Sequence, residues 1–298
     1  MMRLRDLTLA TTAHNNAEMS ADMLRSFEQH VGLADEIVVV DDASKHAFAP
    51  PDLQAPVRVI ETDTPHGFCK ASDLALQSVR TRYALLVDAD VLFQPGDFAG
   101  GYAEFQNGHW AWVNFRQVNF QGASQDAFEQ PLMPPWVFAA GNQVLAWWEK
   151  FQHRPVGLHG SRILEVQVAH SSCTLVEMEM FREVGGFDSW YWQCQSDTDL
   201  SLRFREKGFR VGVDTGYCVK HEGTGGKTGG ASRVMDLYRS RVRLYEKFYP
   251  SSRFYLRPAL FVRHLLELVW FGFRSLYSPD PRLRLRLAMV KGALHGYK

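Results

Sequence analysis

The fold of this chain is decided by residues 83–90, which read YALLVDAD. An uninterrupted apolar run that ends in polar residues predicts a strand buried on both faces, as in a parallel sheet. Two acids follow the run with one residue between them, and alternate side chains of an extended segment point the same way. The carboxylates of Asp88 and Asp90 can therefore converge on one cation, although a solvated turn explains the same residues.

Three similar runs and two helical patterns come before this stretch. Strands are predicted at 7–13, 36–40 and 57–61, and helices at 17–31 and 67–79. The alternation predicts a doubly wound α/β sheet, in which ligands bind at the carboxyl ends of the strands. Asp41 and Asp42 follow the second of these strands, so we expect them at the same edge as the two later acids. An ordinary strand-ending turn is the competing explanation for this pair.

Beyond residue 90 the predicted elements are a strand at 110–120, a strand running into a helix at 173–184, a helix at 198–207 and a strand at 209–213. A carboxylate at a helix start acts either as a general base beside a cleft or as a cap. We favour the structural role for Asp199, and both roles stay open for Asp197. His221 opens a glycine-rich loop at 222–230, which predicts either a phosphate cradle or a mobile lid. By itself this histidine is a structural residue more often than a metal ligand.

The charge of the chain is balanced but unevenly distributed. It carries 33 Lys and Arg against 33 Asp and Glu, yet from Arg233 onward basic residues outnumber acids by 14 to 4. Predicted helices at 232–249 and 258–277 mix these arginines with aromatic and aliphatic residues, a pattern that favours an anionic membrane surface. A solvated helical cap and helix-mediated dimerisation are the alternatives. Nucleic acid is disfavoured because no recognised binding module accompanies the charge.

Other features of the sequence indicate the compartment. The four cysteines form no CxxC pair, which argues against a zinc site and favours reduced thiols in the cytoplasm. The first residues lack the apolar core of a signal peptide, and no stretch of eighteen uncharged apolar residues predicts a membrane span. We therefore expect a cytoplasmic protein, peripheral on the inner face of the cell membrane if the basic helices bind it.

Five segments, in this order, resemble the motifs of the family 2 glycosyltransferases with the GT-A fold. They read VVDDAS at 39–44, GFCKASD at 67–73, DAD at 88–90, VGGFD at 184–188 and SDTDLSLR at 196–203. The later motifs are most similar to those of bacterial rhamnosyltransferase-type members. Two positions depart from the family pattern: Asp73 stands where Asn is usual and Ser196 where Glu is usual.

The resemblance implies a Rossmann-like mixed sheet flanked by helices, and a metal-dependent, inverting transferase. The donor would be a nucleotide diphosphate sugar of UDP, dTDP or GDP, and the acceptor a hydroxyl of a glycan or polyprenyl-linked glycan in bacterial surface polysaccharide synthesis. The catalytic domain would span 1–231, with nucleotide binding in about 1–90 and acceptor binding in about 91–231. Residues 232–298 would form the basic helical region.

The resemblance also assigns roles to individual residues. Asp197 would be the catalytic base. Mg²⁺ or Mn²⁺ would be held directly by Asp90 and His221, and Asp88 would contact the ribose or reach the metal through water. The nucleotide would be bound by Thr11, Asp41, Asp42, Gly67, Lys70 and Asp88. The acceptor would be bound by Asp188, Trp190 and Trp192, and core packing is the competing account for the aromatic residues Trp190, Tyr191 and Trp192.

Two other classes of protein remain as alternatives. A sugar-phosphate nucleotidyltransferase shares the sheet and the acidic metal site, but it needs a Gly-rich, basic turn after the first strand. Residues 11–16 read TTAHNN and lack it. A non-catalytic carbohydrate-binding protein would need neither the paired acids nor Asp197.

Overall fold

The structure is a computed structural model. It describes residues 2–125, 127–129, 132–141, 144, 147–148, 162–223, 230–276 and 282–296. The chain forms two compact units, the first made of residues 1–130 and 157–224 and the second of residues 131–156 and 225–298. The predicted division into a catalytic domain at 1–231 and a basic helical region at 232–298 stays a prediction, and the compact units group residues 131–156 with the C-terminal helices.

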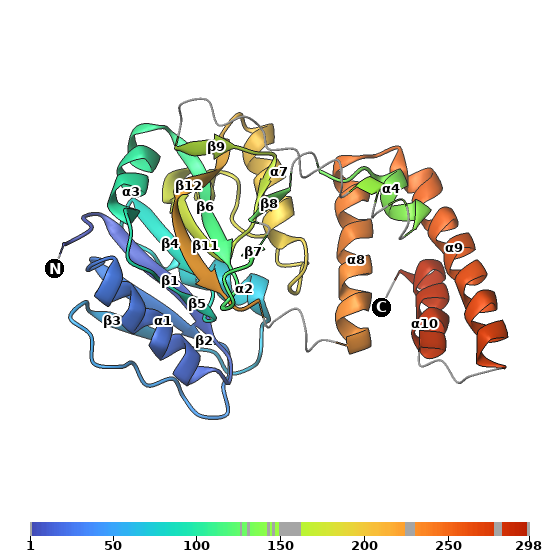
Figure 1. Cartoon of the computed structure of the whole chain (residues 1–298), viewed down its shortest axis with the longest axis horizontal. Coiled ribbons are helices and arrows are strands. Elements are labelled where there is room, and N and C mark those ends of the chain that lie inside the picture. The colour runs from blue at the N-terminus through green and yellow to red at the C-terminus, as the bar shows by residue number, and fades with distance from the viewer. Residues whose placement is uncertain are drawn as a thin grey trace. The chain divides into compact units, whose positions relative to one another are not determined.

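A mixed sheet forms the centre of the first unit (Figure 1). One half is parallel, in the order β3-β2-β1-β4, and comprises β1 (Leu7–Ala13), β2 (Glu36–Asp41), β3 (Val57–Glu61) and β4 (Tyr83–Val87). The other half continues as β11 (Cys173–Glu177), β6 (Trp110–Val118), β12 (Arg210–His221) and β5 (Val91–Leu92). Since β11 runs antiparallel to both β4 and β6, the sheet is mixed, as the family resemblance implies.

Short strands extend the edges of this unit. β7 (Ser124–Gln125) pairs with β6, and β9 (Ile163–Glu165) pairs with β12. β8 (Phe128–Glu129) and β10 (Val168–Ala169) form a separate two-stranded ladder. β12 continues beyond residue 213, where the predicted strand ends. Its register against β6 shifts between Asp214 and Cys218, at a bulge.

Helices cover both faces of the sheet. α1 (Ala17–His30) and α3 (Phe98–Asn107) share one core with the strands, in which Phe27 meets Phe93 and Phe98 edge to face. Val113 of β6 belongs to that core, so its neighbour Trp112 points to the opposite face. There Trp112 packs against Phe187 and against Phe204 of α7 (Ser196–Glu206), beside α2 (Phe68–Gln77) and α6 (Met178–Glu183). The sheet is therefore buried on both sides.

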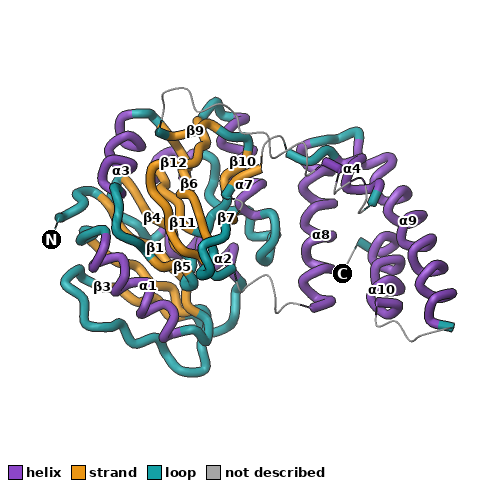
Figure 2. Tube along the Cα trace, viewed as in Figure 1, coloured by secondary structure: helices purple, strands orange, loops and turns teal. Residues whose placement is uncertain are grey.

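The second unit is helical (Figure 2). It consists of α4 (Pro135–Ala140), α8 (Gly230–Phe248), α9 (Ser252–Ser275) and α10 (Arg282–His295). Their buried faces meet around Phe138, Tyr245, Leu260 and Met289. α9 begins six residues before the predicted start at Pro258, which lies inside the helix. Among the described helices, none combines the length and apolarity that a membrane crossing requires.

Candidate active site

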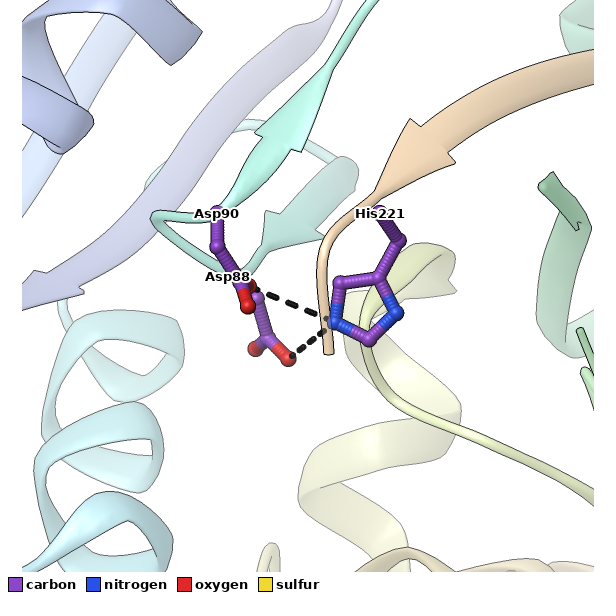
Figure 3. Close-up of side chains that lie close together, drawn as sticks. All are labelled: Asp88, Asp90 and His221. Carbon is purple, nitrogen blue, oxygen red and sulfur yellow. Dashed lines mark ion pairs between the residues drawn. The ribbon is translucent and has the colours of Figure 1, made fainter. Parts of the chain in front are cut away.

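Three side chains from separate strands meet at the carboxyl edge of the sheet (Figure 3). Asp88 follows β4, Asp90 precedes β5, and His221 ends β12. His221 Nε2 lies 3.3 Å from Asp90 Oδ1 and 3.8 Å from Asp88 Oδ2. One ligand atom from each residue falls within 4.8 Å of the others, so the described part of the chain contains a group able to hold a metal ion. The structure brings together all three residues that the resemblance assigns to a metal.

Backbone pairing fixes these positions. His221 pairs with Val91 in the antiparallel ladder of β12 and β5, and the Glu222 amide donates to the Asp90 carbonyl at 3.2 Å. On the other side, the Asp88 amide donates to the Ser172 carbonyl at 2.8 Å, which extends the β4–β11 ladder. The two acids and the imidazole are therefore held by three different strand contacts rather than by one flexible loop.

A buried amide network sets the tautomer of His221. Asn114 Oδ1 accepts a hydrogen bond from the Phe115 amide at 2.8 Å, which identifies this atom as the side-chain oxygen. The same oxygen therefore also accepts from Gln117 Nε2, at 3.3 Å. Gln117 Nε2 also contacts the Ser172 hydroxyl. Gln117 Oε1 then faces His221 Nδ1 at 2.9 Å, and Nδ1 must carry the proton of the neutral ring. In the neutral ring the lone pair is therefore on Nε2, which faces the two acids, as binding to a metal requires. When the ring is protonated, Nε2 instead donates to Asp90.

The electrostatics of the group also suit a cation. The pKa of Asp88 is raised to about 7 as the net result of burial, which raises it most, of the charge of His221, which lowers it, and of the charges of Asp90 and Asp197, which raise it. Asp88 Oδ1 is buried without a hydrogen-bond partner. Burial lowers the pKa of His221, but its hydrogen bond to Asp90 and the charges of both acids raise it overall. Carboxylate oxygens with one imidazole fit a divalent ion such as Mg²⁺ or Mn²⁺.

The acids predicted to bind the nucleotide hold loops at the same edge. Asp41 accepts from the amides of Ser44 at 3.1 Å and Phe48 at 2.7 Å. Asp42 accepts from the amides of His66 at 2.8 Å and Gly67 at 2.9 Å. These bonds support the explanation that Asp41 and Asp42 stabilise turns after the strand, and they assign no ligand to either residue.

The two other predicted nucleotide-binding side chains lie in different surroundings. The Thr11 hydroxyl is buried and donates to the Val87 carbonyl at 2.7 Å, which joins β1 to β4 beside the acids. Lys70 is exposed on the first turn of α2, so its ammonium group can approach an anion. Nucleotide binding by these residues stays a prediction.

Gly67, on the predicted donor side, lies against Trp192, on the predicted acceptor side. Gly67 has φ of 79°, and a Cβ atom there would lie 2.6 Å from the indole ring of Trp192. The Cys69 amide donates to the Trp192 carbonyl at 3.1 Å. Only glycine meets both conditions at position 67, because other residues are strained at positive φ and carry the clashing atom.

The aromatic residues just before α7 differ in their burial. Tyr191 is buried, and its hydroxyl donates to Asp199, as core packing predicts. Trp190 and Trp192 are 37% and 53% exposed, which leaves their rings accessible to an acceptor. Asp188 Oδ1 accepts from the Trp190 amide at 3.1 Å and so shapes this segment.

The two acids of α7, Asp197 and Asp199, also differ in their burial. Asp199 is fully buried and pairs with Arg203 at 2.6 Å, in agreement with the structural role favoured for it. Asp197 is half-buried, and its Oδ1 accepts from the Thr198 amide at 2.8 Å. Its charge acts on Asp88, so the predicted base lies near the metal-binding group.

Comparison with known proteins identifies the family. The model of the family described as glycosyl transferase family 2 matches residues 8–185, which is more than half of the chain. The chain belongs to this glycosyltransferase family. No curated protein matches it. The match includes Asp88 and Asp90 and ends before Asp197 and His221, whose positions rest on the structure.

Solved glycosyltransferases share the fold. The mannosyltransferase PcManGT from Pyrobaculum calidifontis, in complex with GDP-Man and Mn²⁺, has a TM-score of 0.55 at 15% identity, covering 97% of this chain and 86% of that one. GalNAc-T7 with UDP, GalNAc and Mn²⁺ has a TM-score of 0.58 at 13% identity, covering 97% of this chain and 56% of that one. This chain therefore spans little more than half of the second protein. The predicted GT-A fold is confirmed, and family membership argues against the nucleotidyltransferase alternative.

Sequence reasoning missed the residues that support the metal-binding group. Asn114, Gln117 and Ser172 are buried polar side chains that no motif contains. The available signal is an amide at Asn114 and another at Gln117 within a strand whose one other polar residue is Arg116. The glycine-rich loop predicted as a lid or phosphate cradle lies largely outside the described residues, at 224–229.

Proposed function

We propose that this chain is a metal-dependent, inverting glycosyltransferase that uses a nucleotide diphosphate sugar. The observation that supports this most is the group of Asp88, Asp90 and His221 at the carboxyl edge of the sheet, with Asp197 close enough to act on Asp88. Family membership supplies the reaction class, and this group supplies a reason for the metal dependence.

The three residues would hold Mg²⁺ or Mn²⁺ beside the diphosphate of the donor. When bound, the cation neutralises the charge that develops on the leaving diphosphate. Asp41, Asp42 and Thr11 lie at the same edge and would position the nucleoside, while Lys70 would approach the phosphates. The structures of PcManGT and GalNAc-T7 contain GDP-Man or UDP together with Mn²⁺, which supports this class of donor.

Asp197 would take the proton of the acceptor hydroxyl. The oxygen of that hydroxyl then bonds to the anomeric carbon from the face opposite the diphosphate, while the bond from this carbon to the phosphate oxygen breaks. The electron pair leaves with the diphosphate, and the configuration at the anomeric carbon inverts. A positioned base contributes typically about 10²–10⁴-fold to such a step.

The acceptor would be a sugar of a glycan or polyprenyl-linked glycan. Trp190 and Trp192 are exposed just before α7 and offer flat apolar surfaces on which a sugar ring can stack. Asp188 holds the turn that presents them. A role in bacterial surface polysaccharide synthesis, and a rhamnosyltransferase-type donor, are the corresponding subtype proposals from the motif resemblance.

Calorimetric titration tests the donor and the metal together. The protein is titrated with UDP-, GDP- and dTDP-sugars, with and without Mn²⁺, and compared with Asp90→Asn and with Asp52→Asn, an exposed acid as the matched control. We expect one nucleotide to bind in a Mn²⁺-dependent way and Asp90→Asn alone to lose that dependence. Failure of every nucleotide to bind would overturn the proposal.

The stereochemistry is tested separately. Once a donor is identified, proton NMR of the fresh product gives the anomeric configuration of the transferred sugar. We expect it to be opposite to that of the donor. Retained configuration would refute the role of Asp197 as base for a direct displacement.

A further inference from the structure

An uninterrupted apolar face runs along α9, every residue of which the structure describes. Its exposed side chains recur at spacings of three and four residues, so they share one side of the helix. Phe254, Leu266, Trp270 and Phe273 are 86%, 66%, 62% and 64% exposed. The complete face comprises Phe254, Tyr255, Pro258, Val262, Leu265, Leu266, Val269, Trp270, Phe273 and, just beyond the helix, Leu276. We call this set the α9 face.

The α9 face carries no charged side chain over a length of about 33 Å, at 1.5 Å per residue. Exposed apolar surface of this extent marks an interaction site, because soluble surfaces rarely keep such patches continuous. The opposite side of the same helix is already used, since Leu256 and Leu260 are buried in the core of the helical unit. The α9 face is therefore additional to what the fold needs.

Exposed cations lie on α9 and on α10, the helix that packs against it. Arg253 and Arg274 are exposed near the two ends of α9, and Arg284 and Lys291 are exposed on α10, which packs against α9. Along both helices there are eight Lys and Arg residues and one acid, Glu267. Glu267 is turned inward, where it pairs with Arg263 at 3.1 Å and with Arg286 at 2.9 Å. The outer surface of the two helices thus combines apolar and positively charged groups.

We propose that the α9 face and these exposed cations dock on the surface of an anionic lipid bilayer. A helix with one apolar side and flanking arginines lies in the plane of the interface, with its apolar side chains among the acyl chains and its cations at the headgroups. Trp270 suits this depth because its ring is apolar and its N–H can remain near water. The described helices offer no membrane span, so the attachment is peripheral.

A second copy of the chain fits these charges less well. In a two-fold dimer the same patch meets itself, so the exposed cations of α9 and α10 in one copy would come close to those in the other. Like charges brought together in this way oppose association. Anionic lipid neutralises the same cations. Docking on the inner leaflet of a bacterial cell membrane would bring the catalytic unit to polyprenyl-linked acceptors.

Vesicle flotation with the full-length protein tests the docking surface. We compare phosphatidylcholine vesicles with and without phosphatidylglycerol at ~0.1 M salt, where charges are screened beyond about 10 Å. We expect flotation with the anionic vesicles and a loss of at least ~10-fold in binding for the double variant Leu266→Glu, Trp270→Glu. Both side chains are exposed, so the variant should fold, which circular dichroism checks.

Two further variants distinguish the apolar and charged contributions. Arg284→Gln with Lys291→Gln should weaken binding to anionic vesicles about 10-fold or more, since each cation near such a surface contributes about 1 kcal/mol. Met19→Glu, on an exposed apolar residue of α1, should leave vesicle binding unchanged.

The proposal is overturned if the folded wild type does not float with anionic vesicles, or if the double variant floats equally well. It is also overturned if sedimentation shows a dimer that the double variant dissociates while vesicles remain unbound. Donor titration without vesicles should be unaffected in all of these variants. Failure of docking is therefore distinguishable from failure of the proposed transferase function.

Discussion

The two units of the chain differ most in how many large apolar side chains they expose. In the α/β unit, polar side chains such as Asn114, Gln117 and Asp199 are turned inward and hydrogen-bonded, and the described surface carries six large exposed hydrophobic residues. In the smaller helical unit, the described surface carries thirteen. Buried polar networks fix side-chain positions, whereas exposed apolar surface binds something outside the fold. The comparison assigns chemistry to the first unit and attachment to the second.

The largest expected effect separates these two assignments. Asp197→Asn should lower kcat by about 10²–10⁴-fold because the acceptor hydroxyl loses its base, while vesicle binding stays unchanged. Initial rates with saturating donor measure this. Glu206→Gln, an exposed acid of the same helix, is the control and should keep its rate. Full activity of both Asp197→Asn and Asp90→Asn would instead favour a non-catalytic carbohydrate-binding protein.

The next effect tests whether the buried network positions the metal-binding group. Gln117→Leu removes the acceptor for His221 Nδ1, so Mn²⁺ affinity should fall about 10–100-fold, as measured by calorimetry. Gln117→Glu keeps an acceptor at that place and should bind Mn²⁺ more tightly than the Leu variant. If both variants bind Mn²⁺ like the wild type, the network serves the core alone.

A pair of glycine variants tests the contact between the donor and acceptor sides. Gly67 and Gly208 have almost the same φ, 79° and 81°, but a Cβ atom meets Trp192 at the first position and nothing within 4 Å at the second. Gly208→Ala should cost about 1–2 kcal/mol of stability, the backbone strain alone. Gly67→Ala should cost more in thermal unfolding and also raise the acceptor KM. Equal stability losses and an unchanged KM would show that Trp192 moves aside freely.

The smallest effect is a pH dependence of the helical unit. Burial raises the pKa of Glu267, but the hydrogen bond to His264 and the charges of Arg263 and Arg286 lower it to about 2. The ionised carboxylate therefore stabilises the fold above its ordinary pKa near 4.5, and this contribution is lost as pH falls toward 2. Glu267→Gln removes this contribution. At neutral pH, each kcal/mol of unfolding free energy that is lost should lower Tm by roughly 2–4 °C. The difference from wild type should narrow between pH 4.5 and 2; a constant difference would contradict the assignment.

The parallel half of the sheet was predictable because β1, β2 and β4 are apolar runs buried along almost their whole length. Predicted and observed bounds coincide for β1, β3 and β4. α3 escaped prediction because Gly100 and Gly101 interrupt its pattern. Both are needed for space, since Cβ atoms there would lie 2.2 Å from carboxylate oxygens of Asp97 and Asp214 respectively. Local pattern cannot reveal a requirement created by a residue more than a hundred positions away.

The same limit applies to the site. The acids after β4 were identifiable from their position at a strand end, and His221 only from the family pattern. Gln117 was not identifiable, because its role depends on the pairing of β6 with β12 and on Ser172, which lies 55 residues away in the sequence. The grouping of residues 131–156 with the C-terminal unit was not predictable for a related reason: α4 packs with α9, far along the sequence.

The ladder between β5 and β12 also has a consequence for biosynthesis. It is the pairing that brings His221 beside Asp90. At about 5–20 residues per second, the ribosome delivers His221 roughly 7–26 s after Asp90. During that interval the nascent chain presents two acids without their imidazole. In the proposed function, the three side chains can hold a cation together only after this part of the sheet has formed.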